Sequence, residues 1–115
     1  MKIAIPRFGE SVAPCFEYSA TMAIFTVEDA KVISQKDFVL HSQQEFDRVR
    51  LLRDQGVDTL ICGGVRDRFE DMINALGIRV ISWVSGDVDE LLDKFLRGKL
   101  TPGTGRLGYP GKKSG

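Results

Sequence analysis

Two neighbouring stretches of the chain repeat the same order of helix, glycine and strand: LLRDQGVDTLICGG, residues 51–64, and MINALGIRVISWVSG, residues 72–86. In each stretch the pattern predicts the end of a helix, a glycine that terminates it, and a short apolar strand. Helices that alternate with strands in this way connect parallel strands through right-handed crossovers. The second half of the chain therefore predicts an α/β fold.

Apolar residues at helical spacing outline three helices. The sequence SQQE at residues 42–45 has the form of a capping box, so the first helix is expected to begin at about Gln43 and to end before Gly56. The second helix is expected to end at Gly77 and the third at Gly98. The residues expected on the buried faces are Phe46, Val49 and Leu52, then Val65, Phe69, Met72, Ile73 and Leu76, and last Val88, Leu91, Leu92, Phe95 and Leu96.

The first forty residues contain strand patterns without helices. Five strands are expected along the whole chain, at residues 2–6, 21–27, 32–40, 57–62 and 78–84. The short turn at residues 28–31 joins the second and third strands as an antiparallel hairpin. The prediction is a mixed five-stranded sheet with the element order βββαβαβα and helices packed on its faces.

The composition limits the class of protein. The chain has 115 residues, of which 43% are hydrophobic and 28% charged, as expected for one globular domain. Sixteen basic and sixteen acidic side chains cancel, so no overall field attracts nucleic acid or an anionic membrane. Apolar runs are too short to span a bilayer, and no signal peptide is visible. A cytoplasmic protein without nucleic-acid or membrane partners is expected.

The C-terminal segment differs in composition from the rest. Residues 101–115 contain five glycines and two prolines, a composition that buries too little apolar surface to order the chain. We therefore expect a folded domain over residues 1–100 and a flexible tail over residues 101–115.

Three side chains are candidate metal ligands. Cys15 lies in the loop after the first strand, and Cys62 ends the fourth strand just before Gly63 and Gly64. If the first and fourth strands are parallel neighbours, their loops open at the same end of the sheet and the two thiols approach one another. His41, the only histidine, is the third candidate. Without an export signal, free thiols are expected rather than a disulfide.

Each candidate also has a simpler interpretation. A free cysteine is commonly a small core residue, which would account for Cys62. A lone histidine such as His41 is usually solvated. The pair Gly63 and Gly64 suits either a tight turn or the close approach of a ligand to the backbone, and no nucleotide-binding motif surrounds it.

The number of ligands excludes several kinds of site. Two cysteines, one histidine and three methionines are too few for a structural zinc site or a four-cysteine cluster within one chain. The chain could hold a preassembled cluster through one to three ligands, or share a cluster across a dimer. The first strand, KIAIP, lacks the carboxylates of a two-metal nuclease. A Cys15–His41 pair lacks any local signature of a hydrolase.

Three segments carry a family resemblance. They are MKIAIP at residues 1–6, SVAPCFEYSATMAIF at residues 11–25 and GVDTLICGGV at residues 56–65. In this order and spacing they resemble the dinitrogenase iron–molybdenum cofactor biosynthesis family, which includes NifX, NafY and the C-terminal part of NifB. The resemblance covers about residues 1–100.

The resemblance implies an RNase H-like fold without nuclease activity, and a non-catalytic carrier or assembly factor for iron–sulfur or molybdenum-containing clusters or their precursors. Cys15 occupies the position where many relatives have histidine, and Glu17 replaces the usual glycine. A thiolate in place of an imidazole still binds metals, and it suits iron in sulfide clusters or copper(I).

The expected site therefore consists of Cys15, Cys62, Gly63, Gly64 and Arg7 around a cluster, with Cys15, His41 and Cys62 as metal ligands. Arg7 lies near the same loop and is expected to pair with an anionic cluster. Expected partners are the cluster or its precursor and a protein that takes part in cluster assembly. The alternative is a ligand-free interaction or regulatory module on the same fold, in which Cys15 is buried and inert.

Overall fold

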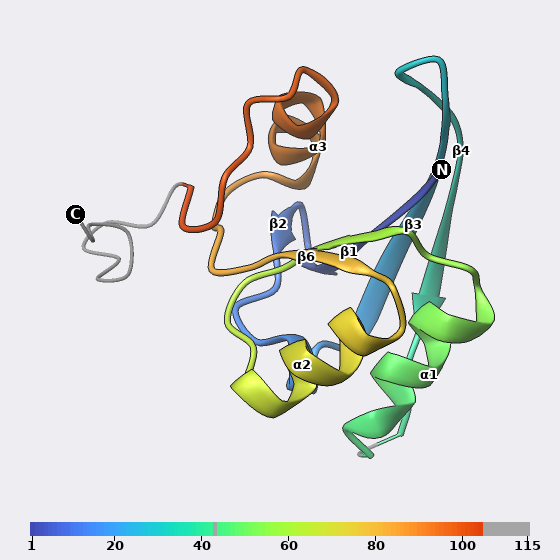
Figure 1. Ribbon diagram of the computed structural model, residues 1–115, viewed down its shortest axis with the longest axis vertical. Coiled ribbons are helices and arrows are strands. Elements are labelled where there is room, and N and C mark those ends of the chain that lie inside the picture. Colours follow the sequence, from blue (N-terminus) through green and yellow to red (C-terminus); the bar gives the residue numbers. More distant parts are fainter. Residues whose placement is uncertain (43, 105–115) are drawn as a thin grey trace.

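The computed structural model describes residues 1–42 and 44–104, and its strands form one mixed sheet (Figure 1). The sheet order is β4-β3-β1-β5-β6. The strands are β1 (Lys2–Phe8), β3 (Thr21–Glu28), β4 (Lys31–Val39), β5 (Thr59–Ile61) and β6 (Arg79–Ile81). A sixth, two-residue strand, β2 (Ser11–Val12), pairs with the end of β1. It was not expected because two residues carry no recognisable period.

The direction of the strands follows the two halves of the chain. β1 pairs antiparallel with β3, and β3 pairs antiparallel with β4. On its other side β1 is parallel to β5, which is parallel to β6. The mixed α/β sheet is therefore confirmed. Because β1, β5 and β6 run in the same direction, the loops that follow them lie at the same end of the sheet.

Strand β1 continues through Pro6, where we expected it to end. Proline has no N–H to donate and is disfavoured inside a sheet. β5 pairs with β1 only at Ile3 and Ala4, and at Pro6 a loop has replaced it, because the N–H of Ala13 donates to the Pro6 carbonyl (2.8 Å). On this side Pro6 only has to accept a hydrogen bond, so its missing N–H leaves no partner without a donor. Strand β1 can therefore continue to Phe8.

The turn between β3 and β4 has two residues in the left-handed region. Glu28 pairs with Lys31, and the residues between them, Asp29 and Ala30, have φ of 52° and 61°. Positive φ at both central positions defines a type I′ turn, which matches the twist of a hairpin. Alanine is strained there because its Cβ approaches the carbonyl oxygen.

Replacing Ala30 by glycine is expected to stabilise the protein. Glycine adopts positive φ without strain, and Asp-Gly is a preferred pair in this turn. We expect the free energy of unfolding to rise by about 0.5–1 kcal/mol. Urea denaturation of wild type and Ala30→Gly measures it, with Ala75→Gly, at the last residue of the helix Asp67–Ala75, as a control that should lose stability. An unchanged or lower stability of Ala30→Gly would contradict the turn geometry.

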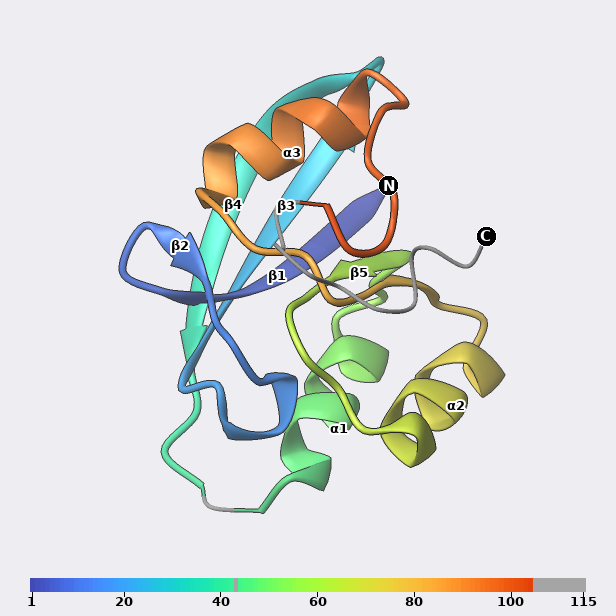
Figure 2. The same ribbon diagram turned by 90° about the vertical axis from the view of Figure 1, so that its left-hand side faces the viewer.

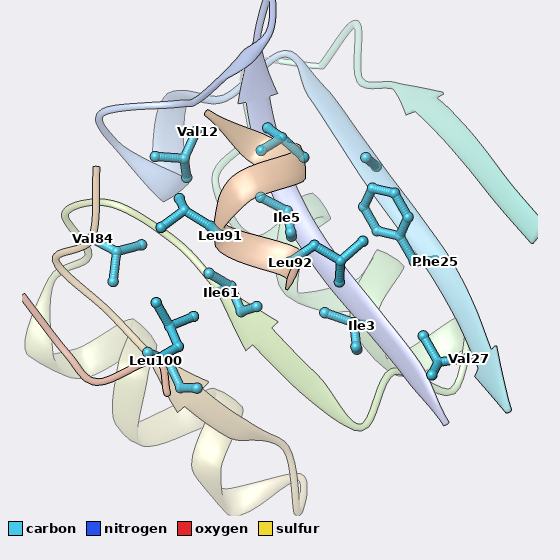
Figure 3. Close-up of a cluster of buried hydrophobic side chains, with 13 residues drawn as sticks. Ile3, Ile5, Val12, Phe25, Val27, Ile61, Val84, Leu91, Leu92 and Leu100 are labelled. Carbon is cyan, nitrogen blue, oxygen red and sulfur yellow. The ribbon is translucent and has the colours of Figure 1, made fainter. Parts of the chain in front are cut away.

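Helices cover both faces of the sheet (Figure 2). Helix α3 (Val88–Leu96) lies on one face, and α1 (Phe46–Asp54) and α2 (Asp67–Ala75) lie on the other. Alternate residues of the strands enter the two cores: Ile3 packs in the cluster with α3, and Ala4 packs in the cluster with α1 and α2. The α3-side cluster includes Ile5, Phe25, Ile61, Leu91 and Leu92 (Figure 3). Helices on both faces were predicted.

Helix α1 begins three residues later than expected, and the capping box does not form. The hydroxyl oxygen of Ser42 accepts the N–H of Gln44 (2.9 Å), which makes a local turn before the helix. Glu45 already has helical φ and ψ, and its side chain caps no backbone group. Serine side chains compete with helices in this way because they bond to nearby backbone groups. Gln43 lies outside the described residues.

Only the start of the expected tail belongs to the described residues. At residues 101–104 the chain turns back to the loop after β6: the N–H of Gly103 donates to the Ser82 carbonyl (3.1 Å) and the N–H of Ser85 to the Thr104 carbonyl (3.0 Å). Residues 105–115 lie outside the description. In the described part of the chain, no helix is long and apolar enough to cross a membrane.

Candidate functional site

The loops after β1 and β5 are joined by backbone hydrogen bonds. The N–H of Phe16 donates to the Gly64 carbonyl (2.9 Å), and the N–H of Gly64 donates to the Pro14 carbonyl (2.7 Å). Cys15 therefore pairs with Gly64 like a residue of a parallel ladder. A short 3-10 helix, η1 (Phe16–Tyr18), follows at once. The two loops meet because β1 and β5 are parallel neighbours, and the Cys15 backbone is held on the sheet.

Gly63 and Gly64 allow this close approach. A Cβ on Gly63 would lie 2.6 Å from the carbonyl oxygen of Ala13 and 2.8 Å from that of Pro14. A Cβ on Gly64 would lie 3.2 Å from the Pro14 oxygen and 3.2 Å from the Trp83 ring. Packing between the loops thus accounts for the absence of a side chain at both positions, most clearly at Gly63.

The exposed thiol of Cys15 lies between two surface hollows. The first, called the Arg7 hollow, measures about 710 Å³ and is lined among others by Arg7, Phe8, Pro14, Cys15, Tyr18 and Asp37. The second, called the Trp83 hollow, measures about 610 Å³ and is lined among others by Cys15, Glu17, Tyr18, Gly64, Arg66 and Trp83. Of the two cysteines, only Cys15 can therefore contact a ligand bound in either hollow.

Arg7 forms one wall of the Arg7 hollow and is held in place by its neighbours. Its guanidinium pairs with Glu10 (3.6 Å) and Asp37 (3.8 Å), and its Nε donates to the Gly9 carbonyl (2.9 Å). Only 18% of the side chain is exposed. The guanidinium is therefore fixed within the hollow, and the carboxylates of Glu10 and Asp37 partly neutralise its positive charge.

Glu17 is buried beside the Trp83 hollow. It is 4% exposed, and its Oε2 accepts the backbone N–H of Arg66 (2.6 Å), the residue that precedes α2. The guanidinium of Arg66 in turn donates to the hydroxyl oxygen of Tyr18 (2.7 Å) and to Oε1 of Glu45 (3.3 Å). These bonds hold η1 and the start of α2 together. Glu45, expected as a capping residue, contributes to this contact instead.

Cys62 lies in the core beneath the site. Its side chain is fully buried in the cluster that packs against α1 and α2. Burial raises the pKa of the thiol, and the negative charges of Glu70 and Glu17 raise this pKa further, so the sulfur stays protonated at neutral pH. Neither hollow is lined by Cys62 or by Gly63.

His41 lies apart from the hollows, in the connection between β4 and α1, where its side chain is exposed. Within residues 1–42 and 44–104, no group of three or more His, Cys, Asp or Glu side chains is arranged to hold a metal ion. Of the six expected site residues, the hollows bring Cys15 together with Arg7 on one side and with Gly64 on the other.

Trp83 is a site residue that sequence reasoning missed. It has φ of 61°, which is rare for a bulky side chain, and its N–H donates to the Gly63 carbonyl (2.9 Å). The backbone is thereby bent so that the ring packs over Gly64. Its position in the sequence could have revealed it, because Trp83 follows β6, the third parallel strand that ends at this edge of the sheet.

A family model described as dinitrogenase iron-molybdenum cofactor matches residues 1–98. The chain belongs to this family. The family is one of iron–molybdenum cofactor biosynthesis or binding. The match confirms the resemblance seen in residues 1–6, 11–25 and 56–65. No curated protein matches the sequence.

Solved structures share the fold of this iron–molybdenum cofactor family member. PH0822 is 23% identical with a TM-score of 0.84, over 98% of this chain and 99% of the other. TM1290 from Thermotoga, described as a NifB-type protein, is 27% identical with a TM-score of 0.68, over 88% and 91%. The apo form of the orange protein from Desulfovibrio gigas is 22% identical with a TM-score of 0.71, over 90% and 93%.

Proposed function

We propose that this protein binds an iron–sulfur or molybdenum-containing cluster, or its precursor, at Cys15, and carries it or assists its assembly in the cytoplasm without catalysing a reaction. The observation that carries the proposal is the position of Cys15. Its thiol is exposed between two hollows while its backbone is hydrogen-bonded to the β5 loop. Membership of an iron–molybdenum cofactor family supports the choice of cargo.

The geometry favours Cys15 over the other candidate ligands. A thiolate is the form that binds metal, and the Cys62 thiol is buried and kept protonated. His41 lines neither hollow. A preassembled cluster held through one thiolate needs further ligands from a partner, from a second chain or from the cluster's own sulfide. This requirement suits a carrier, because a cargo that has few protein ligands can be passed on.

The Arg7 hollow is the better place for such a cargo. Metal–sulfide clusters are commonly anionic, and the Arg7 guanidinium is fixed in this hollow by Glu10 and Asp37. The exposed rings of Phe8 and Tyr18, at 79% and 63% exposure, form part of its wall and could cover the cluster against water. The alternative of a ligand-free module expects Cys15 to be buried, whereas the thiol is exposed.

Anaerobic reconstitution tests the proposal. Wild type incubated with iron, sulfide and molybdate is expected to retain stoichiometric metal after desalting and to show charge-transfer absorption. Cys15→Ser is expected to lose most of both, because serine is a poor ligand for soft metals. Fluorescence of Trp83, the only tryptophan, gives a second readout of metal near Cys15.

Two variants serve as controls. Cys62→Ala removes the buried thiol, and His41→Ala removes the imidazole outside the hollows; both are expected to load metal as wild type does. Equal and sub-stoichiometric metal in wild type and Cys15→Ser would contradict the proposed function. If folded Cys62→Ala failed to load metal, the metal ligand would be assigned to Cys62 instead.

A further inference from the structure

We propose that Glu17 closes the Trp83 side of Cys15 to anions, because its buried carboxylate already accepts the backbone N–H of Arg66, directly before helix α2. In that case an anionic ligand can approach Cys15 only from the Arg7 hollow. This last consequence rests on the proposed function, whereas the exclusion of anions by Glu17 does not depend on it.

The start of α2 has the properties of an anion-binding position. The helix spans Asp67–Ala75, nine residues, and Arg66 and Asp67 at its start, where the positive end of the helix dipole lies, line the Trp83 hollow. Gly64 in the loop before the helix lines the same hollow, but its N–H and its carbonyl are already hydrogen-bonded to Pro14 and Phe16. Without an internal partner, the backbone amides at the helix start would attract phosphate or molybdate.

Glu17 supplies an internal partner for one of these groups, the backbone N–H of Arg66. The side chain is 4% exposed, and Oε2 lies 2.6 Å from the backbone nitrogen of Arg66, directly before the helix. An intramolecular carboxylate has a high effective concentration, so free anions in solution compete with it poorly. The hydrogen bonds of Arg66 to Tyr18 and Glu45 occupy the nearest guanidinium as well.

The two hollows differ in the burial of their carboxylates rather than in their balance of charge. The Trp83 hollow is lined by the carboxylates of Glu17 and Asp67 against the single guanidinium of Arg66. The Arg7 hollow is lined by Arg7 and Asp37, and Glu10 also pairs with Arg7. The side chains of Asp37 and Glu10 are 44% and 85% exposed. Because the carboxylate of Glu17 is buried, solvent screens its repulsion of anions less than that of a surface charge.

Titration with inorganic phosphate and with molybdate tests the inference. Wild type is expected to show no saturable change in the amide chemical shifts of residues 64–68 or in Trp83 fluorescence. Glu17→Gln keeps an acceptor for the Arg66 N–H but removes the charge, and it is expected to bind these anions at least about tenfold more tightly than wild type. Equal responses of the two proteins, whether both bind or neither does, would overturn the proposal.

Glu10→Gln is the matched control, because it makes the same change in net charge beside Arg7, in the ion pair on the other side of Cys15. It is expected to behave as wild type at residues 64–68, and an equal gain of binding there would also overturn the proposal. Should Glu17→Gln fail to fold, Glu17→Ala with added acetate replaces it. A saturable rise of Tm with acetate supports the inference, and its absence contradicts it.

These measurements are independent of metal loading. Phosphate and acetate contain no iron or sulfide and need no thiol, so the titrations can be repeated in Cys15→Ser with the same expected result. Failure of cluster reconstitution would therefore leave the anion result interpretable, and failure of the anion result would leave cluster binding at Cys15 in place.

Discussion

Replacing Gly63 by alanine is expected to lower the free energy of unfolding by about 2–3 kcal/mol. The added Cβ would lie 2.6 Å from the Ala13 oxygen and 2.8 Å from the Pro14 oxygen. Both neighbours are backbone atoms of a loop that is hydrogen-bonded to Gly64, so they cannot move aside as a flexible side chain could. Urea denaturation followed by Trp83 fluorescence measures the loss.

Gly64→Ala is the matched control within the same loop. Its added Cβ would lie 3.2 Å from the Pro14 oxygen and 3.2 Å from the Trp83 ring, so each neighbour has to move by only a few tenths of an ångström. We expect a smaller loss, about 1 kcal/mol or less. If Gly63→Ala were no less stable than Gly64→Ala, the close packing of the two loops would be refuted. Folded Gly63→Ala is also expected to load less cluster, because the Cys15 loop is displaced.

Arg48→Met is expected to cost about 2–4 kcal/mol of unfolding free energy. Arg48 is 4% exposed, and its guanidinium donates to three carbonyls, those of Ser19 (2.9 and 3.1 Å), Ser42 (3.1 Å) and Gln44 (2.8 Å). Methionine fills similar space but leaves these oxygens without their donor. In the described part of the chain, no carboxylate pairs with Arg48, so the hydrogen bonds alone compensate its buried charge.

Arg50→Met provides the comparison on the same helix. Arg50 is exposed and pairs with Asp47 three residues earlier. Exposed pairs contribute little, so we expect a change within about 0.5 kcal/mol. The difference between the unfolding free energies of the two variants, measured by chemical denaturation, gives the contribution of the buried hydrogen bonds of Arg48. Equal stabilities would show that Arg48 does not hold η1 and the segment before α1 together as the structure indicates.

The parts of the fold that depend on local patterns were predictable. Glycines at positions 56, 77 and 98 end the helices as expected, because positive φ after a helix favours glycine. Alternating helices and strands predicted the parallel half of the sheet, and the short turn before Lys31 predicted the hairpin. Local signals failed where a competing contact existed, as at the capping box, where Ser42 bonds to Gln44 in a turn.

The candidate site was likewise predictable only in part. Spacing and order along the chain indicated the family, and they predicted that the loops of Cys15 and Gly64 open at one end of the sheet if their strands are parallel neighbours, as β1 and β5 are. They favoured Cys15 as a ligand and a core position for Cys62, but they could not settle the exposure of either thiol, because exposure depends on what packs over each sulfur. Cys62 lies beneath α1 and α2, and Cys15 lies between two hollows. The carboxylate of Glu17 reaches the start of α2 through a contact between residues 49 positions apart, and no local pattern encodes such a distance.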